Sequence, residues 1–287
     1  MRRLVGGMGC VGVGLRLLLL GTGSPRPTLE RANSGYLVIK GEQPILVDCG
    51  AGVMRRLLES GQDPARITLL FLTHLHSDHT LDYAEFVLGS WAMGRSELAV
   101  YGPPGTERFH QLLLLEPYAD DIAYRVAIGR SPAGVLDVAV HECPLAPGVV
   151  YDDGRLRVQA TPVVHSAPTL ALRFDSGGTS VVISGDTAYC PDLVKLARGA
   201  DVLVHDACPA PALALQPNPV WGHLAERLRH HHATPAEAAR VAREAGVRTL
   251  VLTHVLRGVD EDAALQEARR EFGGTVILGR DLLEVAC

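Results

Sequence analysis

Three histidines and one aspartate follow an apolar run in the stretch LLFLTHLHSDHT, residues 69–80. They are His74, His76, Asp78 and His79, and they lie within six positions. Imidazole nitrogens and carboxylate oxygens are the ligands that borderline divalent cations such as zinc prefer. A lone histidine in a loop is usually satisfied by a backbone carbonyl, but four such residues at this spacing predict a metal site.

Further ligands are expected where other apolar strands end. Strain limits how many side chains of one short loop can reach the same ion, so a second ion and additional ligands are expected. His165 ends the run VQATPVVH, Asp186 lies in VVISGDT, and His254 ends TLVLTH. Polar residues at strand ends are common positions for binding sites. Each of the three alone fits an ordinary capped or core residue, but together with the first cluster they predict a centre with seven ligands.

The elements that must position these residues alternate between strands and helices. This alternation predicts an α/β protein, either with helix–sheet–sheet–helix layers or with a single wound sheet. The expected strands are Leu15–Leu20, Gly35–Ile39, Ile45–Val47, Ile67–Leu72, Leu98–Tyr101, Val135–His141, Leu156–Pro162, Ala171–Phe174, Ser180–Ser184, Val202–His205 and Thr249–Thr253. The expected helices are Val53–Ser60, Arg108–Leu115, Pro191–Ala197, Pro235–Ala245 and Asp260–Phe272.

The best-signalled helix begins at TPAE. Thr234 is the expected N-cap, Pro235 occupies the first helical position, and Glu237 completes a capping box. Gly246 is the expected stop. The preceding stretch 207–221, rich in proline and alanine, is expected to be an irregular loop that acts as a lid.

Composition bounds the remaining possibilities. With 287 residues, of which 47% are hydrophobic, the chain can bury a sizeable core. The formal charge of −5 argues against a general nucleic-acid binder. The six cysteines are scattered, which is typical of reduced thiols in a cytoplasmic protein. We expect residues 1–14 to be a flexible extension and 15–287 a single domain. Arg16 interrupts the early apolar run, so we expect neither a signal peptide nor a membrane span.

The sequence resembles the metallo-β-lactamase fold superfamily, and within it the ribonuclease Z and arylsulfatase-type group. The resemblance extends over about residues 15–287. The motif H-x-H-x-D-H with its ordered partners is specific to the superfamily, and HAT followed by glutamate and alanine is more specific to the ribonuclease Z-like branch. The matching segments are LGTGSP (20–25), ILVDCGAG (45–52), THLHSDH (73–79), VYGPPGT (100–106), SGDT (184–187), HATPAEAA (232–239) and LVLTH (250–254).

This resemblance implies an αββα sandwich with two zinc ions between the sheet edges, and Mn²⁺ or Fe²⁺ are alternatives. It assigns His74, His76 and His165 to one ion, assigns Asp78, His79 and His254 to the other, and makes Asp186 the bridge. The seven residues are the same set that the strand-end argument selects. Asp48 would orient a ligand imidazole through the free ring nitrogen.

Two metal ions about 3.5–4 Å apart can share a water and lower its pKa towards neutrality. The expected chemistry is therefore hydrolysis, with a metal-bridging hydroxide as nucleophile. By resemblance, His232 stabilises the oxyanion and acts as a general acid, and Asp78 also takes a proton. His230 and His231 are expected to face solvent. The pair His205 and Asp206 is expected to be structural, although it lies near the pocket.

The substrate class stays open between two enzymes. A ribonuclease Z that processes tRNA precursors at the 3′ end usually carries a long basic arm, and no such insertion is evident between Gly105 and His165. We therefore expect a phosphodiesterase or sulfatase-like esterase that acts on a small-molecule ester. A tRNA precursor is the alternative substrate. A lactonase or β-lactamase and a non-catalytic metal-binding scaffold are further alternatives. The resemblance also implies a homodimer, and Leu112–Leu115 could serve its interface.

Overall fold

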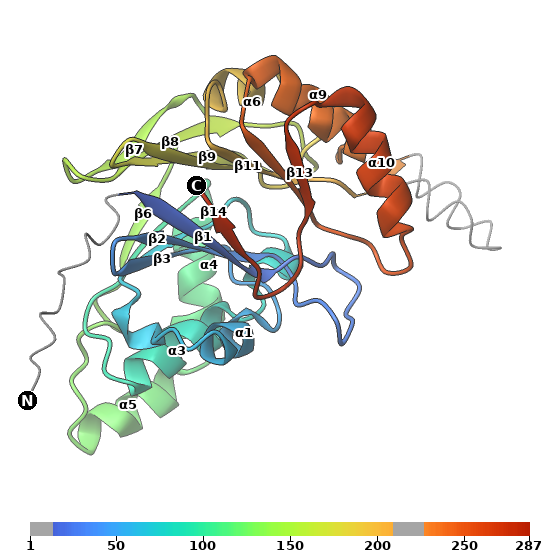
Figure 1. The fold of residues 1–287 in the computed structure, drawn as a ribbon. Coiled ribbons are helices and arrows are strands. Elements are labelled where there is room, and N and C mark those ends of the chain that lie inside the picture. Colours follow the sequence, from blue (N-terminus) through green and yellow to red (C-terminus); the bar gives the residue numbers. More distant parts are fainter. Residues whose placement is uncertain (1–13, 209–226) are drawn as a thin grey trace, which may run out of the picture.

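The computed structural model describes residues 14–208 and 227–287. Two sheets of seven strands each lie face to face, and helices cover the outer surface of each sheet (Figure 1). This is the helix–sheet–sheet–helix arrangement, so the single wound sheet is excluded. The expected extension at 1–14 and the expected lid at 207–221 lie almost entirely outside the described residues.

The first sheet combines an antiparallel and a parallel half. β14, β1, β2 and β3 pair antiparallel, whereas β3, β4, β5 and β6 pair parallel. In spatial order its strands are β14 (Glu284–Ala286), β1 (Leu15–Gly21), β2 (Gly35–Lys40), β3 (Gln43–Val47), β4 (Leu69–Phe71), β5 (Ala99–Gly102) and β6 (Ala139–Glu142).

The second sheet repeats this plan. β13, β12, β11 and β10 pair parallel, and β10, β9, β8 and β7 pair antiparallel. In spatial order its strands are β13 (Thr275–Leu278), β12 (Thr249–Thr253), β11 (Val202–Asp206), β10 (Thr179–Ile183), β9 (Leu170–Ser176), β8 (Arg157–Pro162) and β7 (Gly148–Asp152). The carboxyl ends of parallel strands therefore come together in both sheets.

Helices cover the outer faces because alternate strand residues point outward. Leu17 and Leu19 of β1 lie in the core between the sheets, whereas Leu18 and Leu20 pack against the first helical layer. This two-residue period is the expected geometry of a strand that is buried on both faces. The first layer contains α1 (Val53–Glu59), the 3₁₀ turn η1 (Pro64–Arg66), α2 (Ser77–Thr80), α3 (Tyr83–Ala92), α4 (Thr106–His110), the π-helical turn η2 (Gln111–Leu115) and α5 (Ala119–Ala127). The second contains α6 (Pro191–Leu196), α9 (Pro235–Ala245) and α10 (Glu261–Glu271).

One expected strand begins later than predicted. The run Val135–His141 forms a strand only from Ala139 onward, in β6. The backbone N–H groups of Val135 and Leu136 both donate to the carbonyl of Pro132, so this part of the chain is a turn. Gly134, with φ of +84°, makes that turn without steric cost.

Candidate metal centre

The loop after β4 carries four of the expected ligands to the carboxyl edge of the first sheet. β4 ends at Phe71, and the one-turn helix α2 begins at Ser77. His76 is its N-cap residue, with extended angles of φ −65° and ψ 152°. His74, before the helix, and Asp78 and His79, within it, are all buried. The turn thus packs these side chains into one small volume.

The other three expected ligands come from the second sheet. Asp186 follows the end of β10, His254 directly follows β12, and His165 lies in the connection between β8 and β9. The chain reaches Asp186 through Gly185, which has φ of +60°. A Cβ atom on Gly185 would lie 3.1 Å from the Cβ of Thr73, so glycine here relieves crowding where the two sheet edges approach each other.

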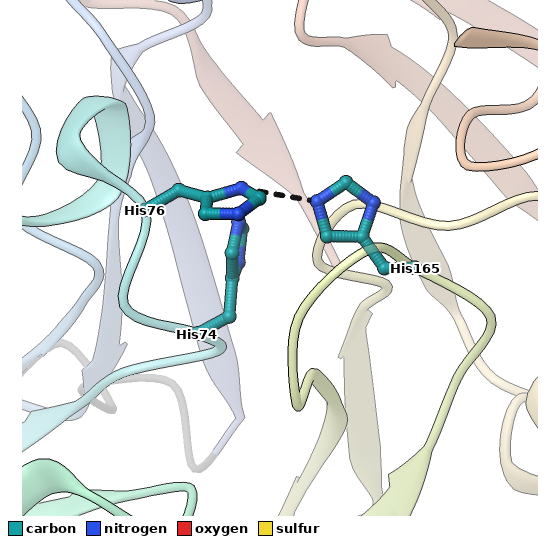
Figure 2. A group of neighbouring side chains, drawn as sticks. All are labelled: His74, His76 and His165. Atoms are coloured by element: carbon teal, nitrogen blue, oxygen red, sulfur yellow. Dashed lines mark hydrogen bonds between the residues drawn. The ribbon is translucent and has the colours of Figure 1, made fainter. Parts of the chain in front are cut away.

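Ligand atoms of these seven residues gather in two groups. One group joins His74, His76 and His165, whose nitrogens lie within 4.8 Å of one another (Figure 2). The other joins Asp78, His79, Asp186 and His254 within the same limit. In the first group, Nδ1 of His76 and Nε2 of His165 are 3.1 Å apart and point at each other across the gap between the two sheets.

Asp186 lies between the two groups. Its Oδ1 is 3.3 Å from Nε2 of His79, and its Oδ2 is 3.3 Å from Nε2 of His254. The same Oδ2 is 3.8 Å from Nε2 of His74 and 3.9 Å from Nε2 of His165. One carboxylate therefore faces imidazoles of both groups.

Hydrogen bonds on the far side of the rings set their orientation. Nδ1 of His79 lies 2.7 Å from Oδ2 of Asp48, and Nδ1 of His74 lies 3.1 Å from the hydroxyl oxygen of Thr73. The Thr73 hydroxyl in turn donates to Oδ2 of Asp48 at 2.8 Å. Asp48 therefore orients His79 directly and His74 through Thr73, and both rings turn Nε2 towards Asp186. The expectation that Asp48 orients a ligand imidazole agrees with this geometry.

The residues fit a pair of divalent cations. Nε2 of His74 and Nε2 of His79 are buried and have no hydrogen-bond partner among the described residues. Buried polar atoms are rarely left without a partner, so ring nitrogens that face a shared carboxylate in this way fit a cation-binding position. The donor set of imidazole nitrogens and carboxylate oxygens is suited to zinc and its neighbours.

The titration of the imidazoles differs between the groups. Burial lowers the pKa of His74, His76 and His165, which keeps these rings neutral. Burial also opposes charge on His79, but Asp186 and Asp48 outweigh it and raise its pKa to about 10. For His254 the carboxylates of Asp186 and Asp78 likewise outweigh burial and raise the pKa well above its ordinary value. Without bound metal, the protonated rings of His79 and His254 thus supply the positive charge that faces Asp186.

His232 lies at the rim of the centre, two residues before the N-cap of α9. The capping box of Thr234 and Glu237 forms as expected, and α9 ends at Gly246 in the left-handed conformation. Nδ1 of His232 is 2.8 Å from Oδ2 of Asp206 and 4.0 Å from Oδ2 of Asp186. Burial lowers the pKa of His232, but the Asp206 carboxylate outweighs it and raises the value.

The sequence did not indicate two of the groups that position these rings. Asp206, expected to be structural, is the partner of His232, and it also accepts the backbone N–H of Cys208 at 3.0 Å. The backbone carbonyl of His231 accepts from Nδ1 of His165 at 2.9 Å. His230 is exposed as expected, whereas His231 is only partly exposed and its Nδ1 is buried. His205 turns its Nδ1 to the carbonyl of Asp206 and joins neither group.

Comparison with known proteins decides the family. Residues 43–255 match the model of the beta-lactamase superfamily domain. The chain belongs to the metallo-β-lactamase superfamily. Its fold and its clusters of histidine and aspartate are those of a metallo-hydrolase of this superfamily.

Curated members of the superfamily align with nearly the whole chain. Ribonuclease Z of Mycobacterium marinum is 36% identical over 280 residues, which cover 94% of this chain and 98% of that protein. Ribonuclease Z of Mycobacterium avium is 37% identical over 284 residues with the same coverage.

Solved structures confirm the fold. The metallo-β-lactamase fold protein YhfI from Bacillus subtilis superimposes with a TM-score of 0.73 at 23% identity and covers 95% of this chain and 99% of its own. The short form of human tRNase Z superimposes with a TM-score of 0.69 at 24% identity and covers 94% and 98%. Within the described residues, every helix is too short or too polar to cross a membrane.

Proposed function

We propose that the protein is a binuclear metal-dependent phosphodiesterase of the ribonuclease Z type, which cuts the 3′ trailer from tRNA precursors. The observation that carries the proposal is the sorting of seven side chains into two groups, with Asp186 of one group facing imidazoles of both. Two metal positions about 3.5–4 Å apart with a common carboxylate are typical of hydrolases that act on phosphodiesters. The relatives named Ribonuclease Z support an RNA substrate.

The proposed ligands follow the two groups. His74, His76 and His165 would hold one ion, and Asp78, His79 and His254 the other, with Asp186 shared. Zinc is the proposed metal, because the set is rich in imidazole, with Mn²⁺ or Fe²⁺ as alternatives. When bound, the ions would lower the pKa of a water and absorb negative charge that develops on the phosphate.

His232 and Asp78 are the proposed donor and acceptor of protons in the reaction. His232 donates Nδ1–H to Asp206, which leaves Nε2 free for a substrate oxygen. Because Asp206 favours the charged imidazolium, His232 is suited to stabilise the oxyanion and to protonate the leaving oxygen. Asp78, whose Oδ2 is 3.1 Å from Nε2 of His254, is the proposed acceptor of the proton from the attacking water.

The missing arm no longer argues against a tRNA substrate. Between Gly105 and His165 the chain forms α4, η2, α5, β6, β7 and β8, with no long arm in that segment. However, the Ribonuclease Z relatives are covered over 98% of their own length, so the alignment leaves no room for an extra long arm there either. The preference for a small ester, which rested on this feature, finds no support in these relatives. A cytoplasmic location follows from the proposed substrate.

A small-molecule phosphodiester is the second candidate. The formal charge of −5 favours it, because a surface that grips a polyanion usually carries an excess of basic residues. The two candidates share the metal centre and differ only in what binds around it.

One assay separates the candidates. Metal-loaded protein is incubated with a tRNA precursor that carries a 3′ trailer and, in parallel, with p-nitrophenyl phosphodiester, sulfate and carboxylic ester substrates. Cleavage of the precursor after the discriminator base is the expected result. Turnover of the small phosphodiester with an intact precursor would instead establish the second candidate. Cleavage of neither the precursor nor the phosphodiester would contradict both, and turnover of the sulfate or carboxylic ester alone would assign another reaction.

The homodimer is also a proposal. In the π-helical turn η2, Leu114 is buried, whereas Leu112 and Leu113 are 47% and 37% exposed. The exposed pair is therefore available to a second copy, whereas burial within the monomer accounts for Leu114. Sedimentation equilibrium of the wild type and of Leu112→Gln should show a dimer that the substitution weakens, and a wild-type monomer would refute this.

A further inference from the structure

Cys208 lies beside the candidate centre and has no role in the proposed reaction. It follows β11 by two residues and is 2% exposed. Its backbone N–H donates to Oδ1 of Asp206 at 3.0 Å, which fixes its position. Its Sγ and ring nitrogens of His232 and His254 all lie within 4.8 Å of one another. These three residues, the thiol cluster, are a further group of possible ligands that shares only His254 with the two groups above.

The two ring nitrogens of His254 face different groups, Nε2 the proposed binuclear centre and Nδ1 the thiol cluster. Nε2 lies 3.1 Å from Asp78 and 3.3 Å from Asp186, within the proposed binuclear centre. Nδ1 is buried and faces the thiol of Cys208, without a close hydrogen bond among the described residues and with Oδ1 of Asp206 3.6 Å away. A buried ring nitrogen without a close hydrogen bond also occurs at His74 and His79 of the binuclear centre, and at His205 and His231 outside it. At His254 it marks the side that faces the thiol.

The donor atoms of the thiol cluster indicate which metal ion it would bind. A thiolate with two imidazoles is a donor set for soft or borderline cations, and none of the seven residues of the binuclear centre offers sulfur. We propose that Cys208, His232 and His254 form a further metal position that takes a thiophilic divalent cation such as Zn²⁺, Cd²⁺ or Co²⁺. On binding, Cys208 releases its proton to solvent and binds as the thiolate. The carboxylate of Asp206 lies beside the added positive charge.

Occupation of this position should inhibit the enzyme, a consequence that rests on the proposed function. A neutral imidazole has one lone pair to give, so His254 can serve the thiol cluster or the ion at Nε2, but not both. The cation would also engage His232, the proposed acid. Excess thiophilic metal should therefore lower the rate of hydrolysis, because it withdraws His254 from the binuclear centre and His232 from the substrate.

Cobalt gives a readout that does not depend on activity. Metal-free protein is titrated with Co²⁺ to an excess, and the near-ultraviolet spectrum is followed for the charge-transfer band of a cobalt–thiolate bond. The band is expected in the wild type and should be lost in Cys208→Ser. The matched control is Cys190→Ser, because Cys190 is also buried but caps α6 outside every ligand group of the described residues. This variant should keep the band.

X-ray absorption at the cobalt edge of the wild type keeps the test independent of how the variants fold. A sulfur neighbour in the coordination shell supports the proposal. A shell of nitrogen and oxygen alone would overturn it, and the thiol would then only accept a hydrogen bond from His254. A band that persists in Cys208→Ser would overturn it as well. Failure of hydrolysis on every substrate would contradict the proposed function, but it would leave the cobalt result unaffected.

Discussion

Replacing Asp206 by asparagine tests whether this carboxylate sets the protonation of His232. Oδ2 of Asp206 accepts from Nδ1 of His232 at 2.8 Å and from the backbone N–H of Thr187 at 3.2 Å. Oδ1 accepts the backbone N–H of Cys208 at 3.0 Å. All three partners donate, and an amide has only one accepting atom. In either orientation of the asparagine, its NH₂ group would therefore face a donor.

The size of the effect follows from these contacts. If the NH₂ group faces His232, Nδ1 must become an acceptor, and the imidazolium loses its stabilising charge. A hydrogen bond to a charged group contributes about 1.5–3 kcal/mol, which is a factor of roughly 10 to 150. General acid–base catalysis as a whole contributes about 10²–10⁴-fold. We therefore expect Asp206→Asn to lower kcat by on the order of 10²-fold, with about 10⁴-fold as the upper bound.

The assay measures kcat on the substrate that the wild type cleaves, together with metal content by atomic absorption. The matched control is Asp201→Asn. Asp201 is a buried carboxylate next to the start of β11, which accepts from the backbone and hydroxyl of Ser180, and its loss should affect stability but not kcat. Asp206→Asn with full metal content and wild-type kcat would refute the reasoning. Loss of metal would show that Asp206 supports His254 rather than His232.

Four further outcomes are expected. Asp186→Ala should lower bound metal from about two ions per chain to about one or none, since Asp186 faces both groups, and unchanged content by atomic absorption would exclude a shared ligand. His232→Ala should retain the metal and lose on the order of 10²-fold in kcat, whereas lost metal would make it a ligand. Zinc uptake at pH 7 should release about two protons from the ligands, because raised pKa values keep His79 and His254 protonated without metal, and up to about one more from the water that the ions share. Calorimetry in buffers of different ionisation enthalpy measures this release, which should fall as the pH approaches the His79 pKa of about 10; a release independent of pH would contradict it. Phe174→Ala should reduce the free energy of unfolding, measured in urea, by about 3–5 kcal/mol. The reason is that its buried ring packs on Phe71, with the two ring centroids 5.4 Å apart. A reduction below about 1 kcal/mol, as for a surface substitution, would contradict a place for Phe174 in the core.

The sequence predicts best where the signal is local. The capping box at Thr234 and the left-handed stop at Gly246 form as expected, because both motifs are complete within a few residues. The expected central strands also form, since each is a short apolar run that is buried on both faces. The ligand loop belongs to the same class, because four of its side chains lie within six positions.

The sequence did not predict several elements that are stabilised by tertiary contacts rather than by local sequence. β7, β13 and β14 have three to five residues and complete sheet edges, where pairing with a neighbouring strand rather than composition defines the strand. α3 mixes aromatic and β-branched residues, which favour strands in isolation, and its helix is stabilised by packing of Tyr83 and Phe86 on the first sheet. In each case the stabilising partner is distant in sequence.

The supporting residues of the centre were missed for the same reason. Asp206 contacts His232 across 26 positions, and the carbonyl of His231 reaches His165 across 66. A backbone carbonyl has no signature in the sequence at all. The proposed ligands could be predicted from the sequence because their residue types are unusual at strand ends, whereas the residues that orient them are common types in ordinary positions.

Backbone strain marks the centre independently of its side chains. Among the described residues that are not glycine, positive φ angles occur only at Asp48, His254 and Leu282. Two of these lie at the candidate centre, at +56° and +59°, each directly after a central strand of one sheet. Glycine would adopt this conformation without cost, and strain of this kind costs on the order of 1–3 kcal/mol per residue. The carboxylate of Asp48 and the imidazole of His254 are the groups that glycine would remove. The conformation is therefore retained because both side chains must turn from the sheet edges into the centre, where Asp48 positions His79 and His254 faces Asp186.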